Sequence, residues 1–507
     1  MKTYLVWAIL LVVLATVPLP NEVPKRLVGS KIFTESVILG DMLQQLAEDA
    51  DVPMGHLREL GGTQVVYQSL KNGEIVGYVE YTGTIDEEIF AGQKISNAAE
   101  RAEQLATDGI LMSSPLGFNN TYGLAMRADR AEALKVSRIS DLGRIPDLVF
   151  GFANEFMDRA DGWPGLKQHY RLPHEKAVGL HHDLAYRQIE AGEIDVMDAY
   201  TTDAKIEPYE LTLLEDDLEY FPTYEAVILY SQSIADERPE LILAWSQLAG
   251  ALDEEQMSQL NARVDLESES ESFAAATFLQ EKFNIESEMK EETALTRICH
   301  TTVEHLDLVR RSLIPAILVA IPLGILASKS AWLGQTVLGI AGMIQTIPAL
   351  ALLVLLMPVA HGLGLSSVGP GSATAIICLF LYSLLPVIRN TVAGLHNIPS
   401  AYQDSASALG LSSFWKLNYV ELPLATRTIL AGIKTAAVLN IGYATLGALI
   451  GAGGFGQPIL TGIRLNRFSL ILEGAVPAAV LALLVQGAFE LLERYAIPRG
   501  LRVRKSA

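Results

Sequence analysis

The chain has 507 residues and a formal charge of −20, yet half of its residues are hydrophobic and its mean hydropathy is +0.28, properties that one soluble domain does not combine. Residues 301–507 hold 14 Lys+Arg against 7 Asp+Glu, net +7, which leaves 24 basic and 51 acidic residues, net −27, for residues 1–300. An acidic part precedes a basic apolar part, which excludes a simple cytosolic enzyme and argues against nucleic-acid binding, while two distant cysteines exclude a disulfide framework.

The chain opens with an apolar segment. Lys2 is followed by an apolar run, Tyr4–Leu19, which is typical of a secretory signal or of an uncleaved membrane anchor. The small-x-small cleavage pattern is poor because Pro18 follows Ala15-Thr16-Val17, so both interpretations stay open. In either case, residues 1–20 would export the chain that follows.

Short apolar strands alternate with helical patterns over residues 27–112, which predicts α/β units. The first strand, Leu27–Lys31, ends in a turn, and Thr34 then opens a helix. The apolar face predicted for this helix is Val37, Ile38, Met42, Leu43 and Leu46. A turn at a helix N-terminus presents backbone N–H groups and can hold an anionic ligand group, although an ordinary strand–turn–helix is the alternative.

Clusters of aromatic, amide and hydroxyl residues follow the predicted strands, where open α/β sheets bind ligands. Converging tyrosines would suit a methylated ammonium, which donates no strong hydrogen bond and is attracted to ring faces at ~0.5–2 kcal/mol each. For any single tyrosine the alternative is a packing role. The candidate ligand-binding residues are Ser30, Thr63, Tyr81, Thr84, Asn120, Tyr122, Arg159, Tyr200, Thr202, Asp203 and Tyr224.

This acidic part resembles the substrate-binding domains of ABC importers for glycine betaine, choline, carnitine and related osmoprotectants. The resemblance covers residues 26–285 and implies a type II periplasmic-binding fold, whose two α/β lobes close on the ligand by hinge motion. The chain would cross between lobes near Ser113–Phe118 and Leu214–Tyr224. The stretches that carry the resemblance are Leu60–Thr84, Gly117–Tyr122, Phe152–Leu166 and Asp198–Asp203.

The same resemblance places the family's aromatic cage on Tyr81, Tyr200 and Tyr224. Tyr122 is the candidate for a fourth ring, and Phe118 is another. Each of these rings would offer a face to the ligand's cationic group.

Two further residues take their expected roles from the resemblance. Thr84 or a neighbouring hydroxyl would help to hold the ligand's polar end. Arg159 would meet a ligand carboxylate or bridge the lobes, with a solvated surface arginine as the alternative. Ile32 stands where the family turn often has Asn, so the identity of the ligand stays open.

Five apolar stretches after His305 are long enough to cross a bilayer, which needs ~20 mostly apolar residues. Buried helices of a soluble core are the alternative, but five runs of this length exceed what such a core uses. The stretches are Leu306–Ala327, Thr336–Val359, Ala373–Ile388, Ile429–Ile450 and Leu470–Leu492.

Positive residues orient these stretches, because Lys and Arg gather in cytoplasmic loops. If the first stretch runs inward, the inner side receives Lys329, Arg389, Lys416, Arg427, Arg494, Arg499, Arg502, Arg504 and Lys505. Arg464 and Arg467 do not fit, nor do Arg310 and Arg311, which can extend to the interface. The C-terminus would be cytoplasmic and residues 21–300 outside, as the export segment also predicts.

The loop between the third and fourth stretches reads Tyr402–Gly410, then nine residues, then Val420–Pro423. It resembles the EAA loop of bacterial ABC import permeases, a coupling helix that seats in the ATPase; an ordinary amphipathic cytoplasmic loop is the alternative. Asp404-Ser405-Ala406 replaces Glu-Ala-Ala but keeps the charge and the small size. The resemblance assigns ATPase coupling to Asp404, Ser405, Ala406, Gly410, Leu422 and Pro423.

The chain carries no G-x-x-x-x-G-K-[ST] phosphate loop. We therefore expect no cofactor and no metal in this chain, and ATP with Mg in a separate ATPase subunit. The chain itself would perform no covalent chemistry. The glycine-rich stretch Gly451–Gly456, which allows close helix packing, also resembles osmoprotectant permeases.

The sequence thus predicts a two-lobed α/β binding domain followed by an all-α type-1 permease bundle. The predicted function is the receptor–permease subunit of an importer for a quaternary ammonium osmoprotectant, acting as a homodimer in the inner (plasma) membrane with a cytoplasmic ATPase. Alternatives are the same architecture importing ergothioneine or an amino acid, and a membrane-anchored sensor. The predicted domains are 1–20, 26–285, a linker 286–305, 306–495 and a basic tail 496–507.

Overall fold

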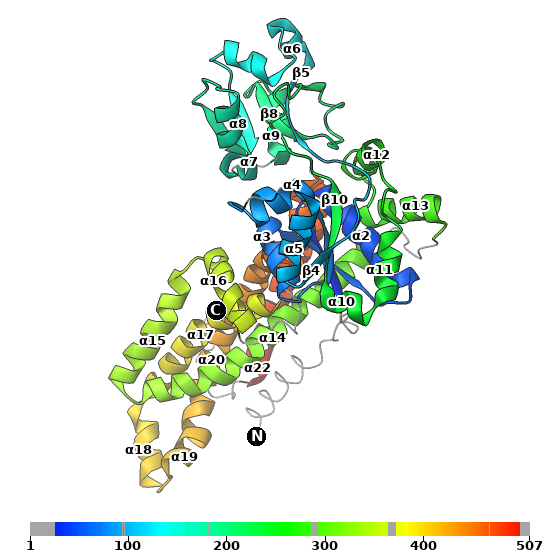
Figure 1. Cartoon of the computed structure of the whole chain (residues 1–507). Coiled ribbons are helices and arrows are strands. Elements are labelled where there is room, and N and C mark those ends of the chain that lie inside the picture. The colour runs from blue at the N-terminus through cyan, green and yellow to red at the C-terminus, as the bar shows by residue number, and fades with distance from the viewer. Residues whose placement is uncertain are drawn as a thin grey trace. The chain divides into compact units, whose positions relative to one another are not determined.

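The computed structural model describes residues 26–93, 95, 97–159, 161–180, 182–285, 293–362, 372–465 and 467–496. The chain divides into two compact units, an α/β unit within Pro24–Glu291 and a helical unit within Glu292–Ala507 (Figure 1). The predicted N-terminal segment and the predicted tail beyond residue 496 lie outside the described residues.

The first lobe of the α/β unit is built on a five-stranded sheet with the strand order β2-β1-β3-β10-β4. Strand β1 pairs in parallel with β2 and β3, whereas β10 runs antiparallel to β3 and β4. The strands are β1 (Leu27–Lys31), β2 (Gly55–Gly61), β3 (Gly77–Tyr81), β4 (Ile110–Met112) and β10 (Ala226–Ser231).

Helices cover the sheet of the first lobe (Figure 1). They are α2 (Thr34–Asp49), α3 (Thr63–Lys71), α4 (Thr82–Thr84), the π-helical turn η1 (Ile85–Ile89), α5 (Ala98–Thr107), α10 (Gln232–Glu237), α11 (Pro239–Ser246), α12 (Glu254–Asp265) and α13 (Glu271–Phe283). The apolar face predicted for α2 is fully buried, as its spacing requires for a helix packed on a sheet.

The second lobe has a sheet of its own, with the strand order β7-β6-β8-β5-β9. Strand β6 pairs in parallel with β7 and β8, and β5 runs antiparallel to β8 and β9. The strands are β5 (Tyr122–Arg127), β6 (Phe150–Ala153), β7 (Ala177–Leu180), β8 (Val196–Tyr200) and β9 (Leu211–Leu213). The helices are α6 (Ala128–Leu134), the 3-10 helix η2 (Ile139–Arg144), α7 (Asn154–Asp158), α8 (Trp163–His169) and α9 (His182–Glu190).

Two segments connect the lobes, one between β4 and β5 and one between β9 and β10. They meet at an antiparallel bridge between Asn119 and Glu225. Tyr81 ends β3, Tyr200 ends β8, and Tyr122 begins β5, where it lies opposite Tyr200 in the ladder. The connections therefore bring strand ends of both lobes to one junction, as the resemblance implied.

The helical unit consists of long apolar helices. Among the described residues, four helices are long and apolar enough to cross a membrane. The number rises to five if a bent pair of helices is counted as one further span. The elements are α14 (Ala294–Ser328), α15 (Ala331–Thr346), α16 (Ala349–Gly362), α17 (Ser372–His396), α18 (Ser400–Ala408), α19 (Ser413–Lys416), η4 (Leu417–Glu421), α20 (Leu422–Ala444), η5 (Thr445–Ile450), α21 (Gly456–Arg464) and α22 (Phe468–Ala496). Helix α14 begins at Ala294, so the last part of the predicted linker is helical.

The second predicted stretch, Thr336–Val359, is not one straight span. It breaks into α15 and α16, which bend by 97°. Pro348 has no N–H to continue the helix, and Ile347 before it is extended, as a residue preceding proline prefers to be. Tyr382 on α17 closes the break, because its hydroxyl donates to the Ile347 carbonyl and its own carbonyl accepts from Gln345 Nε2 at 2.9 Å.

A neutral polar network joins three helices inside the helical unit. Asn440 on α20 donates to Ser312 Oγ on α14 at 3.1 Å and accepts from Ser383 Oγ on α17 at 3.1 Å. All three side chains are fully buried. Arg310 and Arg311, which do not fit the charge pattern of the sequence, both pair with Asp307, at 2.8 and 2.7 Å.

Candidate ligand-binding cleft and coupling loop

The junction between the lobes gathers aromatic rings around Tyr122. Its ring lies 4.9 Å from Tyr200, 5.6 Å from Tyr224 and 5.1 Å from Phe156, centre to centre. Phe221 stands at 6.2 Å. The structure therefore places Tyr122, the residue predicted as a possible fourth cage ring, at the centre of the cluster.

Phe33 extends this cluster to the first lobe. Its ring lies 6.2 Å from Tyr81 and is stacked 6.2 Å from Tyr200. The sequence predictions left Phe33 out of the site, and its place directly after the turn that ends β1 is the signal that could have found it. The other candidate ring, Phe118, is buried and has no ring contact among those described, so Tyr122 suits the fourth position better.

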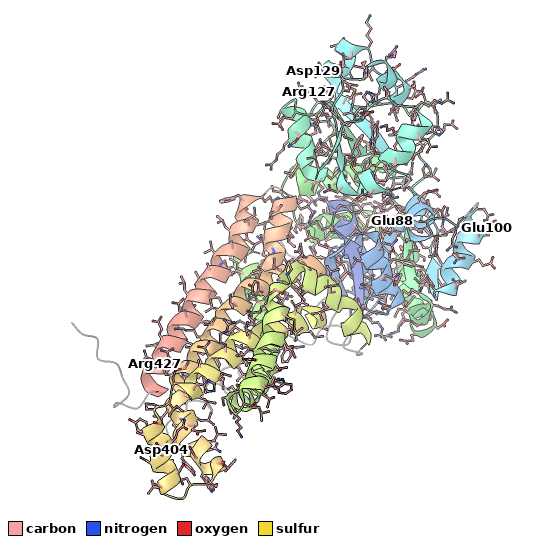
Figure 2. All side chains as sticks on the ribbon, turned by 90° about the vertical axis from the view of Figure 1, so that its left-hand side faces the viewer. Glu88, Glu100, Arg127, Asp129, Asp404 and Arg427 are labelled. Carbon is pink, nitrogen blue, oxygen red and sulfur yellow. The ribbon has the colours of Figure 1, made fainter. Side chains whose placement is uncertain are left out.

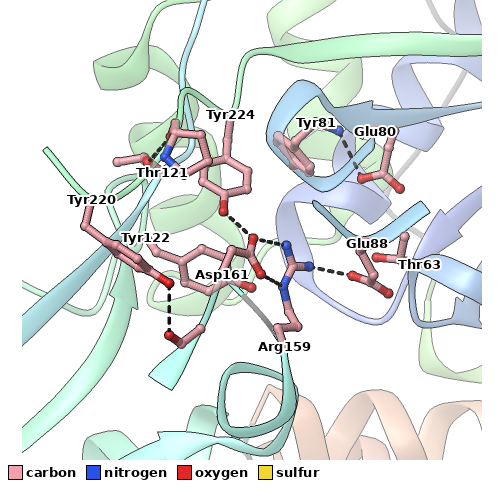
Figure 3. A network of polar contacts seen from close by, with 12 residues as sticks. Thr63, Glu80, Tyr81, Glu88, Thr121, Tyr122, Arg159, Asp161, Tyr220 and Tyr224 are labelled. Carbon is pink, nitrogen blue, oxygen red and sulfur yellow. Dashed lines mark hydrogen bonds and ion pairs between the residues drawn. The ribbon is translucent and has the colours of Figure 1, made fainter. Parts of the chain in front are cut away.

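Arg159 lies in this cleft and connects the two lobes (Figure 3). Its guanidinium donates to Asp161 through Nε and Nη2, at 2.8 and 2.5 Å, and through Nη1 to Glu88 of the first lobe at 2.5 Å. Tyr224 donates its hydroxyl to the same Asp161 carboxylate at 2.6 Å. The guanidinium also stands over the ring of Tyr122, 5.6 Å from its centre.

These contacts exclude one interpretation of Arg159, and its contact with a ligand carboxylate stays a prediction. Its side chain is only 10 % exposed, so it is no solvated surface arginine. It bridges the lobes, and two carboxylates balance its charge. Its guanidinium and the Tyr122 ring form a cation–π contact within the chain itself.

Lys31 supplies a second cation beside the cluster. Its ammonium forms an ion pair with Glu80 and lies 5.2 Å from the ring centre of Tyr81 and 5.8 Å from that of Phe33. Thr63 Oγ1 stands 3.5 Å from the Lys31 Nζ. Thr63 is therefore brought to the cleft, as predicted from its strand-end cluster, whereas Lys31 was not among the predicted site residues.

Glu35, at the start of α2, is the most heavily hydrogen-bonded carboxylate of the cleft. It accepts from Tyr81 Oη at 2.5 Å, Asn120 Nδ2 at 2.8 Å, Thr202 Oγ1 at 2.6 Å and Asn261 Nδ2 at 3.1 Å. Burial raises the pKa of the Glu35 carboxyl above its ordinary value, and these four hydrogen bonds oppose that rise. For this turn the sequence left open a site for an anionic ligand group or an ordinary strand–turn–helix; the structure places one of the chain's own carboxylates in the first turn of the helix.

Glu35 thus explains the positions of Asn120 and Thr202. Both predicted residues contact its carboxylate, and Thr202 belongs to the second lobe whereas Glu35 belongs to the first. Asn120 lies on a segment that connects the lobes. These two residues are therefore brought to the junction through Glu35.

Asp203 serves the second lobe itself. Its carboxylate accepts from His182 Nε2 at 3.0 Å, Tyr186 Oη at 2.6 Å and the backbone N–H of Tyr200 at 2.9 Å. Burial disfavours a charged His182, but Asp203 and Asp198 outweigh it and raise the pKa of His182 well above its ordinary value. Asp203 therefore orders the turn that carries Tyr200.

Ser30 and Thr84 are buried beside the cleft, but the described contacts do not join them to the ring cluster. Ser30 Oγ accepts from the backbone N–H of Glu59 at 3.2 Å and helps to hold β2 against β1. Thr84 ends the short helix α4 that follows Tyr81. Their predicted contact with a ligand stays a prediction.

The loop of Asp404 forms a helix with a defined end. Helix α18 stops at Ala408, and Gly410 adopts a positive φ of 74°. The N–H of Gly410 donates to the Ser407 carbonyl at 3.0 Å, and the N–H of Leu411 donates to the Ala406 carbonyl at 3.2 Å. This is the Schellman arrangement, which requires a left-handed residue and explains the glycine.

The residues assigned to coupling divide between the surface and the core. Asp404 and Ser405 are exposed, Ala406 is buried, and Pro423 is the second residue of α20, directly after the π-helical segment η4. Leu422 packs against the apolar core of the helical unit. Figure 2 shows Asp404 and Arg427 toward the same end of the helical unit.

Large apolar side chains around this helix are exposed: Tyr402, Leu409, Phe414, Trp415 and Tyr419, with Leu409 at 80 %. Contiguous exposed apolar groups mark interaction surfaces.

Comparisons with known proteins cover both units. Residues 27–281 match the substrate-binding domain of the ABC-type glycine betaine transport system, and residues 320–499 match the inner membrane component of binding-protein-dependent transport systems. The chain belongs to this family of ABC import proteins. As a member of the family, it is a membrane-embedded transport subunit rather than an enzyme, and it takes a small-molecule substrate.

Relatives of this import protein are permeases of Bacillus subtilis (strain 168). It is 35 % identical over 205 residues to the choline transport system permease protein OpuBB, an alignment that covers 40 % of this chain and 91 % of the relative. It is 44 % identical over 184 residues to the glycine betaine/carnitine/choline transport system permease protein OpuCD. That alignment covers 36 % of this chain and 77 % of the relative. A crystal structure of a glycine betaine/carnitine/choline ABC transporter is 24 % identical, with a TM-score of 0.45, over 52 % of this chain and all of the other.

Proposed function

We propose that the chain is the combined receptor and permease subunit of an ATP-driven importer for a quaternary ammonium osmoprotectant such as glycine betaine, choline or carnitine. One observation supports this class of ligand. Rings from both lobes, Phe33, Tyr81, Tyr122, Tyr200 and Tyr224, meet at one junction, and a guanidinium already stands over one of them. A quaternary ammonium offers no N–H, so ring faces are its natural partners.

The two-lobed geometry supports a closing mechanism. Arg159 pairs with Glu88, and Thr202 with Glu35, and each pair joins the second lobe to the first. Hinge opening would break these contacts and expose the rings, and ligand binding would restore them. The closed receptor would then deliver its ligand to the permease.

The permease role rests on the loop of Asp404. Its capped helix and exposed apolar rings suit the groove of a cytoplasmic ATPase subunit, which would bind ATP and Mg and move this helix. The ATPase face would then be cytoplasmic, with the C-terminus on the same side and residues 21–300 outside. The same loop disfavours the membrane-anchored sensor, which needs no such helix.

We further propose that two copies of the chain form the transport pathway together, because the four or five spans of a single copy are too few to enclose such a pathway. Each copy would bring its own receptor. Tethering the receptor to the permease replaces the diffusion of a free receptor by a high effective concentration.

Ligand binding by the full chain in lipid nanodiscs tests the ligand class. Titrations with glycine betaine, choline, carnitine and ergothioneine should give saturable binding to at least one of the first three. Tight binding of ergothioneine alone would favour the importer of a trimethylated histidine derivative. Binding of an ordinary amino acid, with all four compounds inactive, would contradict the aromatic-cage assignment.

Gly410→Trp tests the coupling loop. The residue has a positive φ and no neighbouring atom within 4 Å, so tryptophan would strain the turn and project from the surface offered to the ATPase. We expect ATP-driven uptake to fall to background with ligand affinity unchanged. Gly410→Asn, which tolerates the left-handed conformation, should keep most of the uptake; unimpaired uptake by Gly410→Trp would contradict the loop assignment.

A further inference from the structure

Glu35 is a buried carboxylate whose hydrogen-bond partners are all neutral. Its side chain belongs to a residue only 2 % exposed, and its four donors are two hydroxyls and two amides. A buried ionised carboxylate is costly unless a cation balances it. Within the described residues, no lysine, arginine or histidine forms an ion pair with Glu35.

The cations beside the ring cluster are already balanced, including His182, which lies 4.9 Å from the Tyr200 ring and pairs with Asp203. Lys31 pairs with Glu80, and Arg159 pairs with Asp161 and Glu88. Arg159 with its two carboxylates carries a net negative charge. Among the described residues, the lobe junction therefore has an excess of negative charge. Glu35 is the carboxylate there that no cation pairs with.

The two asparagines that donate to Glu35 add to this electronegative character. Each uses its amide nitrogen for the carboxylate, which leaves the side-chain oxygens Asn120 Oδ1 and Asn261 Oδ1 buried without a hydrogen-bond donor. The carboxylate fixes the orientation of both amides, because turning either one would point oxygen at oxygen. Three buried groups thus offer negative potential at one place.

This place adjoins the ring cluster. Tyr81, whose hydroxyl donates to Glu35 Oε1, contacts Phe33 with its ring. Thr202, which donates to Oε2, follows Tyr200 by two residues. A cation held among these rings would lie near the carboxylate.

We propose that Glu35 is the counter-charge for the ligand's ammonium group, so that the cleft selects a true cation over a neutral molecule of the same shape. The inference rests on the proposed function. Ring faces alone favour a cation modestly, whereas a buried carboxylate beside them, at an effective dielectric constant of about 20, adds roughly ten- to hundredfold in affinity. Burial raises the pKa of the Glu35 carboxyl, and a bound ammonium would oppose that rise by favouring the charged carboxylate.

The test compares two ligands of one shape in the full chain in nanodiscs. Choline carries the charge, and 3,3-dimethyl-1-butanol replaces its nitrogen by carbon. In Glu35→Gln, which keeps the size and polarity of the side chain, the ratio of choline to alcohol affinity should fall roughly ten- to hundredfold. The alcohol's own affinity should change little.

Thr202→Val is the matched control. It removes one hydrogen bond from the same carboxylate but leaves the charge, so both affinities should fall by similar factors and their ratio should hold. A purely structural role for Glu35 predicts the same pattern in Glu35→Gln. A folded Glu35→Gln chain with the wild-type ratio would therefore overturn the inference.

A second variant covers the case that Glu35→Gln does not fold. Asn261→Lys would bring an ammonium to Glu35 Oε2, which Asn261 Nδ2 now contacts at 3.1 Å, and would balance the charge internally. Choline affinity should fall more than alcohol affinity, and an unchanged ratio would overturn the inference. A wild-type chain that binds none of choline, glycine betaine and carnitine would instead overturn the proposed function on which the inference depends.

Discussion

The two units bury polar side chains in contrasting ways. In the α/β unit, the buried polar groups at the lobe junction include charged side chains and come from elements far apart in the chain, as in the contacts of Arg159 with Glu88 and of Glu35 with Thr202. In the helical unit, Ser312, Ser383 and Asn440 are neutral.

The two networks also differ in how completely they are satisfied. Each serine of this network has a carbonyl of its own helix within hydrogen-bond distance, at 2.9 Å for Ser312 and 2.8 Å for Ser383, and the single hydroxyl hydrogen of Ser383 is shared between that carbonyl and Asn440 Oδ1. The junction keeps buried oxygens on Asn120 and Asn261 without donors. A network whose polar groups are paired with one another holds helices together. A network that keeps an unbalanced charge and acceptors without donors suits a ligand.

Among the variants that test this contrast, Arg159→Gln should cause the largest loss of ligand affinity. The change leaves Asp161 and Glu88 without their cation at a mostly buried position, and removing one partner of a buried pair typically costs about 3–5 kcal/mol. We expect choline or glycine betaine affinity, measured by calorimetry on the full chain, to fall at least about a hundredfold.

Arg138→Gln is the control for Arg159→Gln. Arg138 pairs with Glu215 on the surface of the second lobe, with both side chains more than half exposed, and such pairs contribute little. A hundredfold loss in this variant as well, or a small one in Arg159→Gln, would remove the distinction between junction and surface charges.

A smaller effect is expected from Tyr200→Leu. The ring stacks on Phe33 of the first lobe and lies beside Tyr122 of the second, so its loss removes one face of the cluster. At ~0.5–2 kcal/mol for a cation–ring contact, affinity should fall roughly three- to thirtyfold.

Tyr200→Phe separates the ring of Tyr200 from its hydroxyl. It keeps the ring and removes the hydroxyl, which lies 3.5 Å from the hydroxyl of Tyr122. Affinity should stay within about a factor of three of the wild type. An equal loss in both variants would show that the hydroxyl matters rather than the ring face.

The sequence allowed the architecture to be predicted, together with several residues that the structure brings to the lobe junction, because both follow from local patterns. Strand-end tyrosines and a helix with an apolar face are visible in a single stretch of chain. What the prediction missed depends on contacts between distant segments. Glu35 reads as an ordinary first-turn acid, and only the fold brings Thr202 and Asn261 to it.

The broken second span shows the same limit. Its composition predicts one apolar helix, and Pro348 alone does not specify a 97° bend, since membrane helices tolerate proline. The hydrogen bonds from Gln345 and to Ile347 that accommodate the bend come through Tyr382, a residue of another helix. Patterns within a segment predict elements, whereas partners across segments determine their exact course.

The smallest effect should come from Asn440→Leu in the helical unit. Both serines keep their own helix carbonyls as acceptors, so the variant loses two interhelical hydrogen bonds without stranding a charge. Such bonds average about 0.6 kcal/mol in membrane bundles, with values up to about 1.7. Thermal unfolding of the full chain in detergent should shift by only a few degrees, with ligand affinity unchanged.

Asn440→Asp provides the comparison for Asn440→Leu, because it has nearly the same shape but places a carboxylate at a fully buried position among neutral partners. It should destabilise the helical unit far more than leucine does, since that carboxylate lacks a cation there. If Asn440→Leu instead folds normally but abolishes uptake, the network contacts the transported molecule. Completeness of hydrogen bonding would then no longer separate a packing network from a functional one.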